Sequence, residues 1–361
     1  MADMFDYIRW RGDIPFSQVP PTPVDMLIFS TLAYVRLEGV VTERLQLTAL
    51  FRVAVKTLLA LPDAEKRCRN ENDLVLLNAA AESERFGNVR LTYYRDVFIP
   101  EEDTQFAAVS YLLDDGTACL AFRGTDNTLV GWKEDFNMTF QDSIPAQRLA
   151  KEYVQAFLEV HRVPVRLTGH SKGGNLAVYA AAKSRSEIQG QILEVYNFDG
   201  PGFTAPMMTD TGYRNVIPKI RTYVPQSSVF GMLLEREEPH RIIRSSQIGL
   251  LQHDAYSWEV LGGGFVLEES LTADSRFLDR TFKTWLAGMT SEERNEFFDT
   301  VFELLMIENT NRPRDLIRPQ NLLAYFKNLK SDESMRKVIA AELANLIQSA
   351  RAAQNKQDDT Q

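Results

Sequence analysis

Apolar and polar positions first follow a strand-like pattern near residue 90. Three runs read as strands, at 89–96, 105–113 and 117–123, because apolar residues recur at every second position or fill the whole run. Asp114-Asp115-Gly116 lies between the last two runs and is a strong signal for a tight hairpin turn. This part of the chain therefore predicts an antiparallel start to a sheet.

After residue 123 the pattern changes to alternating helices and strands. Apolar positions at helical spacing predict helices at 146–160 and 175–184. Short apolar runs predict strands at 165–168, 192–198, 220–224 and 241–245. Alternation of this kind is typical of a mostly parallel sheet flanked by helices, so we expect an α/β fold of the α/β-hydrolase type.

The two ends of the chain are predicted to be helical or irregular. Residues 1–70 read as an N-terminal arm with a helix or two, one of them near 24–37, and residues 72–86 read as a further helix that precedes the sheet. Beyond residue 271 the strand signals stop, and helices are expected at 277–286, 291–306, 319–329 and 333–352.

These patterns divide the chain into four parts. We expect N-terminal helices packed on the core over 1–70 and a hydrolase core over 71–270. A helical region over 271–355 would be a cap or an accessory module, and the polar tail 356–361 is predicted to be disordered.

Composition narrows the class of protein. The chain has 361 residues, 44% of them hydrophobic, and a formal net charge of -9, which argues against a nucleic-acid-binding surface. Two cysteines cannot form a disulfide framework. The N-terminus lacks the apolar core of a signal peptide, and the longest apolar stretch, 26–35, is too short to span a bilayer. We therefore expect a cytoplasmic protein with no integral membrane segment.

One motif carries specific chemistry. Gly169-His170-Ser171-Lys172-Gly173 directly follows a predicted strand and precedes a predicted helix, as a GxSxG nucleophile turn requires. Ser171 is thus the candidate nucleophile, and the backbone N–H of Lys172 is a candidate oxyanion donor. HExxH, Walker and GxGxxG motifs are absent from the sequence, so we expect neither a metal nor a cofactor.

The base that activates Ser171 follows by elimination among four histidines. His161 and His240 lie at the opposite edge of the predicted sheet, and the side chain of His170 is expected to point away from the site. His253 lies beyond the last predicted parallel strand, at the carboxyl edge, and follows the serine in the chain order of this fold. We therefore assign the base to His253.

Segments around this motif resemble known families. Phe122-Arg123-Gly124-Thr125, with Trp132 and Asp135-Phe136 after it, is similar to class 3 lipases, and this resemblance implies that Thr125 helps to form the oxyanion hole. A narrower resemblance, to the bacterial Mbeg1-like proteins, rests on Gly169-His170-Ser171-Lys172-Gly173-Gly174-Asn175, Asn197-Phe198-Asp199-Gly200-Pro201-Gly202 and Gln252-His253-Asp254. The resemblance to class 3 lipases covers about residues 74–260, and the narrower segments lie within it. The resemblance implies the fold and the catalytic apparatus, without a substrate.

The third member of the triad departs from the lipase pattern. No carboxylate occurs at 223–228, where class 3 lipases carry the acid. Asp199, at the end of the preceding strand, is the best substitute, and its alternative role is a turn aspartate that bonds its own backbone. Asp210 and Glu235 are weaker candidates, and Asp254 is unsuited because adjacent side chains rarely orient one another.

Lys172 also departs from lipases, which favour an apolar residue after the serine. Its side chain would either favour an anionic or polar substrate, or lie in solvent at the start of the helix. Asp126 and Glu134 are possible ion-pair partners.

The leading interpretation is a serine hydrolase that cleaves a small-molecule carboxylic ester or thioester through an acyl-enzyme on Ser171. The alternative is a hydrolase-fold binding or regulatory protein with little or no turnover, for which the C-terminal helical region would be the surface that binds a protein partner.

Overall fold

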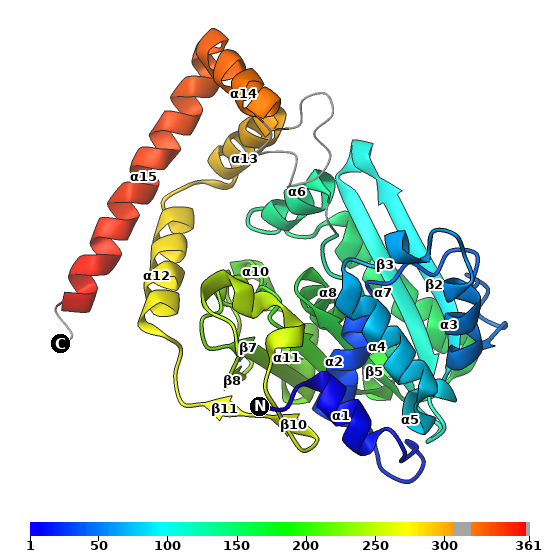
Figure 1. Ribbon diagram of the computed structural model, residues 1–361. Coiled ribbons are helices and arrows are strands. Elements are labelled where there is room, and N and C mark those ends of the chain that lie inside the picture. Colours follow the sequence, from blue (N-terminus) through cyan, green and yellow to red (C-terminus); the bar gives the residue numbers. More distant parts are fainter. Residues whose placement is uncertain (127, 306–318, 359–361) are drawn as a thin grey trace.

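The computed structural model describes residues 1–126, 128–305 and 319–358. Its centre is a nine-stranded sheet within these residues, in the order β1-β2-β3-β4-β5-β6-β7-β8-β11 (Figure 1). The strands are β1 (Ala49–Leu50), β2 (Arg90–Ile99), β3 (Thr104–Leu112), β4 (Ala118–Phe122), β5 (Val165–His170), β6 (Ile192–Phe198), β7 (Ile220–Pro225), β8 (His240–Ile243) and β11 (Leu267–Glu268). β9 (Val260–Leu261) and β10 (Gly264–Phe265) form a separate small hairpin.

Strand directions confirm the predicted α/β fold. β1 to β4 are antiparallel, β4 to β8 are parallel, and β11 closes the far edge antiparallel to β8. The predicted hairpin joins β3 and β4, and Gly116 adopts a φ of 83° in its turn, a conformation that glycine tolerates best. The parallel block places several strand ends at one carboxyl edge.

Helices cover both faces of the sheet. Alternate residues of β4 show why, since Cys119 and Ala121 join one apolar core while Leu120 and Phe122 join the other. The first core contains α1 (Met4–Arg11), α2 (Pro23–Leu32), α3 (Phe51–Leu59), α4 (Glu71–Glu82) and α5 (Glu84–Gly87). The second contains α7 (Pro145–His161), α8 (Lys172–Ala182), α9 (Ser186–Gln191), α10 (Ala205–Met208) and α11 (Thr211–Val216).

Two predicted N-terminal helices differ from the structure. The predicted helix 24–37 ends at Leu32, and turns with bonds from Tyr34 N to Thr31 O and from Val35 N to Leu32 O continue the chain. The predicted helix 72–86 is broken at Ser83, whose extended backbone ends α4 and whose side chain accepts the Phe86 N–H to start α5. Local capping therefore overrides a continuous apolar pattern.

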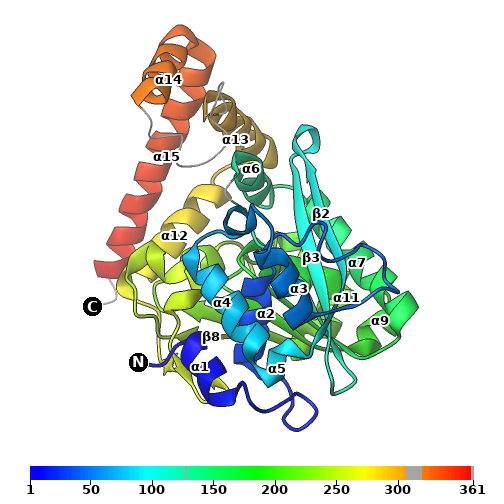
Figure 2. The same cartoon turned by 45° about the vertical axis from the view of Figure 1, so that its right-hand side comes forward.

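The C-terminal region forms α12 (Ala273–Ala287), α13 (Ser291–Leu305), α14 (Pro319–Ser331) and α15 (Glu333–Asp358). These helices confirm the helical extension, and α12, α13 and α15 share an apolar cluster around Trp285 and Phe298. Figures 1 and 2 show them as a layer beside the α/β body, with α13 next to α6 (Leu129–Asn137). Of the predicted tail 356–361, α15 includes 356–358, and 359–361 lie outside the described residues, as does Met306 at the end of the predicted helix 291–306.

This layer touches the body at the carboxyl edge of the sheet. Phe136 of α6 stacks on Phe298 at 4.6 Å, and Lys133 pairs with Asp299 at 3.0 Å. At the other side, the Ser275 hydroxyl of α12 donates to the backbone oxygen of Ser228. Across the described ranges, no helix is both long and apolar enough to cross a membrane.

Candidate active site

Ser171 occupies the sharp turn between β5 and α8. Its backbone has φ 59° and ψ -133°, a strained conformation for a residue with a side chain. A Cβ built on Gly169 would overlap the Gly173 backbone, and one built on Gly173 would overlap the oxygen of Phe122. The two glycines of the motif thus allow the close strand–helix packing that holds the turn.

Asp199 lies beside this turn because β6 pairs with β5. The Ser171 N–H donates to the oxygen of Phe198 at 2.8 Å, so Ser171 and Asp199 leave adjacent strand ends. Asp199 has a φ of 53°, and its N–H donates to Tyr223 O of β7. The end of β6 therefore supplies a carboxylate at the edge where the Ser171 turn lies.

The carboxylate of Asp199 contacts His253. His253 Nδ1 lies 2.6 Å from Asp199 Oδ2, and the Ser228 hydroxyl donates to Asp199 Oδ1 at 2.5 Å. Asp199 is fully buried, whereas His253 is partly exposed. Because a carboxylate only accepts, this contact assigns the ring proton to Nδ1 and leaves Nε2 with a free lone pair.

Within the described residues, no hydrogen bond joins the Ser171 hydroxyl to His253. The two residues are nevertheless linked through the neighbour of the serine, since His170 Nε2 lies 2.8 Å from the backbone oxygen of His253. Unliganded sites often hold a nucleophile and base in looser geometry than the reacting complex.

His170 was expected to point away from the site, and this was wrong. Its ring lies 4.6 Å from the His253 ring, and the Tyr34 hydroxyl lies 3.0 Å from its Nδ1. Because a carbonyl only accepts, His170 donates through Nε2 to His253 and accepts at Nδ1 from Tyr34. Burial, with smaller effects from the charges of His253 and Arg69, lowers the pKa of His170 well below its usual value, so the ring stays neutral.

No local signal in the sequence pointed to this support of His253. Tyr34 comes from the N-terminal part, 136 residues before His170. Its position depends on the end of α2, which packs against β5 and β4. A Cβ on Gly124 would overlap the Tyr34 hydroxyl, so the glycine after Arg123 makes room for this contact.

Thr125 lies just beyond the end of β4, the strand that pairs with β5. Its hydroxyl donates to Asp135 Oδ2 at 2.5 Å. Asp135 Oδ1 is buried, and burial, only partly offset by the Lys172 charge and the Thr125 hydrogen bond, raises the pKa of Asp135 to about 6. Since the hydroxyl is already used, the backbone N–H of Thr125 is the group available as an oxyanion donor.

The Lys172 side chain is fully buried, so both expectations for it, a substrate contact and a solvated position, were wrong. Its Nζ pairs with Glu134 Oε2 at 2.8 Å, which confirms Glu134 as its partner. Its backbone N–H belongs to the first turn of α8 and has no acceptor within the helix. The partial positive charge at this end of α8 is directed at Ser171.

The other acid and histidine candidates have separate roles. Asp254 caps a short 3₁₀ helix by accepting the Tyr256 N–H, and Asp210 caps α11 and pairs with Lys183 at 2.6 Å. Glu235 contributes backbone hydrogen bonds to Phe203. His161 Nε2 contacts Leu45 O at 2.8 Å, and His240 starts β8.

Apolar side chains surround His253. The Phe230 ring lies at a tilt to the His253 ring, with 4.5 Å between the ring centroids, and Phe230 is 41% exposed. The segment immediately before His253 exposes Ile248, Leu250 and Leu251 by 79%, 60% and 64%. These residues form an apolar rim beside the candidate site.

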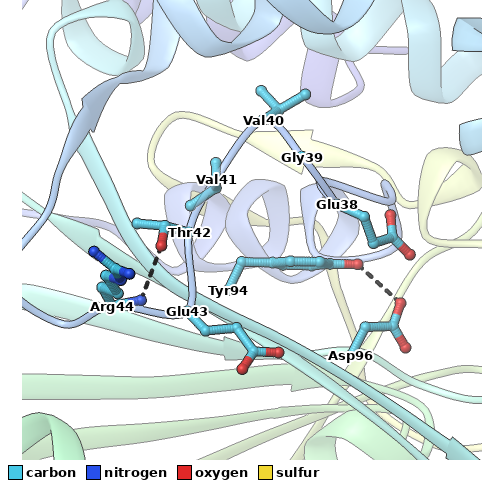
Figure 3. A pocket seen from close by; sticks show the side chains of 9 residues that line it. All are labelled: Glu38, Gly39, Val40, Val41, Thr42, Glu43, Arg44, Tyr94 and Asp96. Carbon is cyan, nitrogen blue, oxygen red and sulfur yellow. Dashed lines mark hydrogen bonds between the residues drawn. The ribbon is translucent and has the colours of Figure 1, made fainter.

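A cavity of about 640 Å³ lies elsewhere, between the loop 38–44 and β2 (Figure 3). Glu38, Glu43, Arg44, Tyr94 and Asp96 line it, with Gly39, Val40, Val41 and Thr42. The Tyr94 hydroxyl donates to Asp96 at 2.9 Å (Figure 3). None of the candidate catalytic residues lines this cavity.

The sheet, the strained serine turn and the flanking helices define an α/β protein of the hydrolase fold class. A family model described as Mbeg1-like matches residues 80–303, which is more than half of the chain. The chain therefore belongs to the Mbeg1-like family, as the resemblance implied.

Other comparisons add little to this assignment. No curated protein matches the chain. A solved structure titled as that of M37 lipase is similar to it with a TM-score of 0.34 and 16% identity. The alignment covers 57% of this chain and 68% of that one.

Proposed function

We propose that this protein is a serine hydrolase that cleaves a carboxylic ester or thioester through an acyl-enzyme on Ser171. The observation that carries the proposal is the 2.6 Å contact between His253 and the buried Asp199 beside the strained serine turn. A buried carboxylate fixed on a histidine selects the tautomer that a serine nucleophile requires. A protein that only binds a partner has no need of this arrangement.

In the proposed acylation step, Ser171 Oγ attacks the carbonyl carbon and its proton passes to His253 Nε2. The carbonyl oxygen becomes an oxyanion that accepts from the backbone N–H groups of Thr125 and Lys172. When the intermediate collapses, the bond to the leaving group breaks, and His253 returns the proton to the alcohol or thiol that departs. Asp199 stabilises the imidazolium formed between these events.

Deacylation repeats the sequence with water. His253 takes a proton from the attacking water while the water oxygen bonds to the acyl carbon. The bond from the acyl carbon to Ser171 Oγ then breaks, the proton returns to Ser171 Oγ, and the carboxylic acid leaves. The apolar rim of Phe230, Ile248, Leu250 and Leu251 favours a substrate with an apolar group near the scissile bond. This rim argues against a small, fully ionic substrate.

The proposal is tested with a fluorophosphonate probe, which phosphonylates activated serines. Wild type should be labelled at one site, and Ser171→Ala should not be labelled although it folds. His253→Ala should react at least about 10³-fold more slowly, because the base is lost. A folded wild type that takes no label would contradict the proposal.

A binding role without turnover is the second candidate, favoured by one observation on the C-terminal helices. Leu343 and Ile347, one turn apart on α15, are 50% and 53% exposed. Paired exposed apolar residues on a helix are suited to a protein partner. The double variant Leu343→Glu/Ile347→Glu should abolish such binding while leaving fluorophosphonate labelling unchanged.

A further inference from the structure

The buried ammonium of Lys172 joins parts of the chain that are far apart in sequence. Its Nζ donates to Gln105 O at 3.0 Å, to Gln105 Oε1 at 2.8 Å and to Glu134 Oε2 at 2.8 Å. An ammonium group has three N–H donors, so all of them are used within the protein. The side chain therefore has no donor left for a substrate.

Glu134 extends this connection to two further elements. Its Oε2 also accepts the Gln105 N–H at 3.1 Å, and its Oε1 accepts the Ala146 N–H at 3.0 Å. Both charged side chains are fully buried. The pair thus joins the nucleophile helix α8 to β3, to α6 and to the first turn of α7.

Stability alone is a weak explanation for such a pair. Removing two charges from water costs several kcal/mol each, and well-packed apolar replacements are often as stable or more so. A buried ion pair immediately after the proposed nucleophile is therefore expected to have a functional effect as well as a structural one.

The pair also positions the loop after β4. Gln105 Oε1, which accepts from Lys172, also accepts the Asp126 N–H at 3.4 Å. Asp135, next in the chain to the partner of Lys172, accepts the Thr125 hydroxyl at 2.5 Å. Thr125 is therefore held on both sides by groups tied to Lys172.

We propose that Lys172 is a positioning residue of the oxyanion hole, whose side chain fixes the distance between its own backbone N–H and that of Thr125. This inference rests on the proposed function, since it assigns a task within that site. Oxyanion donors act only when both lie at about 2.7–3.1 Å from the developing charge. A loosened loop would therefore reduce the stabilisation of the transition state more than it reduces the affinity for substrate.

The test uses the double variant Lys172→Met/Glu134→Gln, which removes both buried charges and keeps the backbone N–H of residue 172. Fluorophosphonate at saturation counts the folded active sites, and turnover is measured on p-nitrophenyl butyrate. We expect kcat per labelled site to fall by about 10–100-fold, less than or equal to the loss of one whole donor. KM should stay within about twofold, because ground-state binding does not use the oxyanion contacts.

A matched control lies at the other end of the same helix. Lys183 follows α8 and pairs with Asp210 at 2.6 Å, away from the Thr125 loop. Lys183→Met/Asp210→Asn should leave kcat and KM within about twofold of wild type. A purely structural role of Lys172 would lower the unfolding midpoint and leave kcat per labelled site unchanged, which would overturn the inference.

Gln105→Leu provides a second test should the charged pair prove necessary for folding. It removes the acceptor shared by Lys172 and Asp126 and keeps the ion pair with Glu134. We expect kcat per labelled site to fall by at least about fivefold with little change in KM. An unchanged kcat would overturn the inference, whereas a wild type that takes no label would overturn the proposed function and the inference together.

Discussion

Replacing Asp199 by Asn is the sharpest perturbation of the proposed triad. Both oxygens of the buried carboxylate accept, one from His253 Nδ1 at 2.6 Å and one from the Ser228 hydroxyl at 2.5 Å. Asn has nearly the same shape but only one acceptor, and its amide nitrogen donates. One of the two neighbours must therefore face a donor in Asp199→Asn.

The magnitude follows from which neighbour loses its acceptor. In one amide orientation the Asn oxygen accepts from His253 Nδ1, and the Asn nitrogen donates to the Ser228 hydroxyl, which can rotate to accept. In the other orientation Nδ1 of His253 must accept, so the ring proton moves to Nε2 and the ring cannot take the proton of Ser171. Loss of the correct tautomer lowers kcat by about 10⁴ in serine triads. Because the first orientation retains the correct tautomer, we expect kcat to fall by about 10³–10⁴-fold, which corresponds to a loss of about 4–5.5 kcal/mol of transition-state stabilisation.

The assay is turnover of p-nitrophenyl butyrate per folded site, with circular dichroism to verify the fold. Asp210→Asn is the matched control, because Asp210 is a carboxylate of the same region that caps α11 and pairs with Lys183. It should retain full kcat. If Asp199→Asn kept more than a tenth of the wild-type kcat, the assignment of Asp199 as the triad acid would be refuted.

Three further changes probe the surroundings. Gly231→Ala should lower kcat/KM at least about tenfold in the same ester assay, because a Cβ there would overlap Asp199 Oδ1 and shift it from His253. His170→Phe keeps the ring but loses the donor to the His253 backbone, and about 1 kcal/mol for that bond predicts a loss of kcat of about fivefold. Burial raises the pKa of Asp135 to about 6, so its charged form destabilises the fold increasingly from about pH 4 to pH 6. In urea unfolding, Asp135→Asn should therefore gain stability relative to wild type over that interval and hold the gain above it.

The parallel part of the fold was accessible from the sequence because its strands are buried on both faces. Such strands read as continuous apolar runs, and β6 has the predicted bounds 192–198. Helices α3 and α6 were not predicted. α3 begins at Phe51 and has no side-chain cap from the preceding Leu50, and α6 is a short helix of 9 residues that begins soon after a strand.

The residues of the candidate site also differ in how far their roles depend on the folded chain. Ser171 and His253 were predicted as nucleophile and base from a local motif and from chain order, both of which can be read from the sequence. The contact of Asp199 with His253 spans 54 residues and depends on strand order, so the sequence left its role open. Lys172 was misread for a related reason, since a cation at a helix start is unfavourable locally and Glu134, 38 residues earlier, compensates for it only in the fold.

The energetic costs at this edge of the sheet favour turnover over binding alone. Ser171 and Asp199 both have positive φ values, of 59° and 53°, and each such residue costs of the order of 1–3 kcal/mol. Asp199 adds a buried charge, which the folded state tolerates through the donors His253 and Ser228. A surface that only binds a partner has no use for a strained serine or for a histidine of fixed tautomer. Because these costs coincide at two adjacent strand ends, they support the proposed acyl transfer on Ser171.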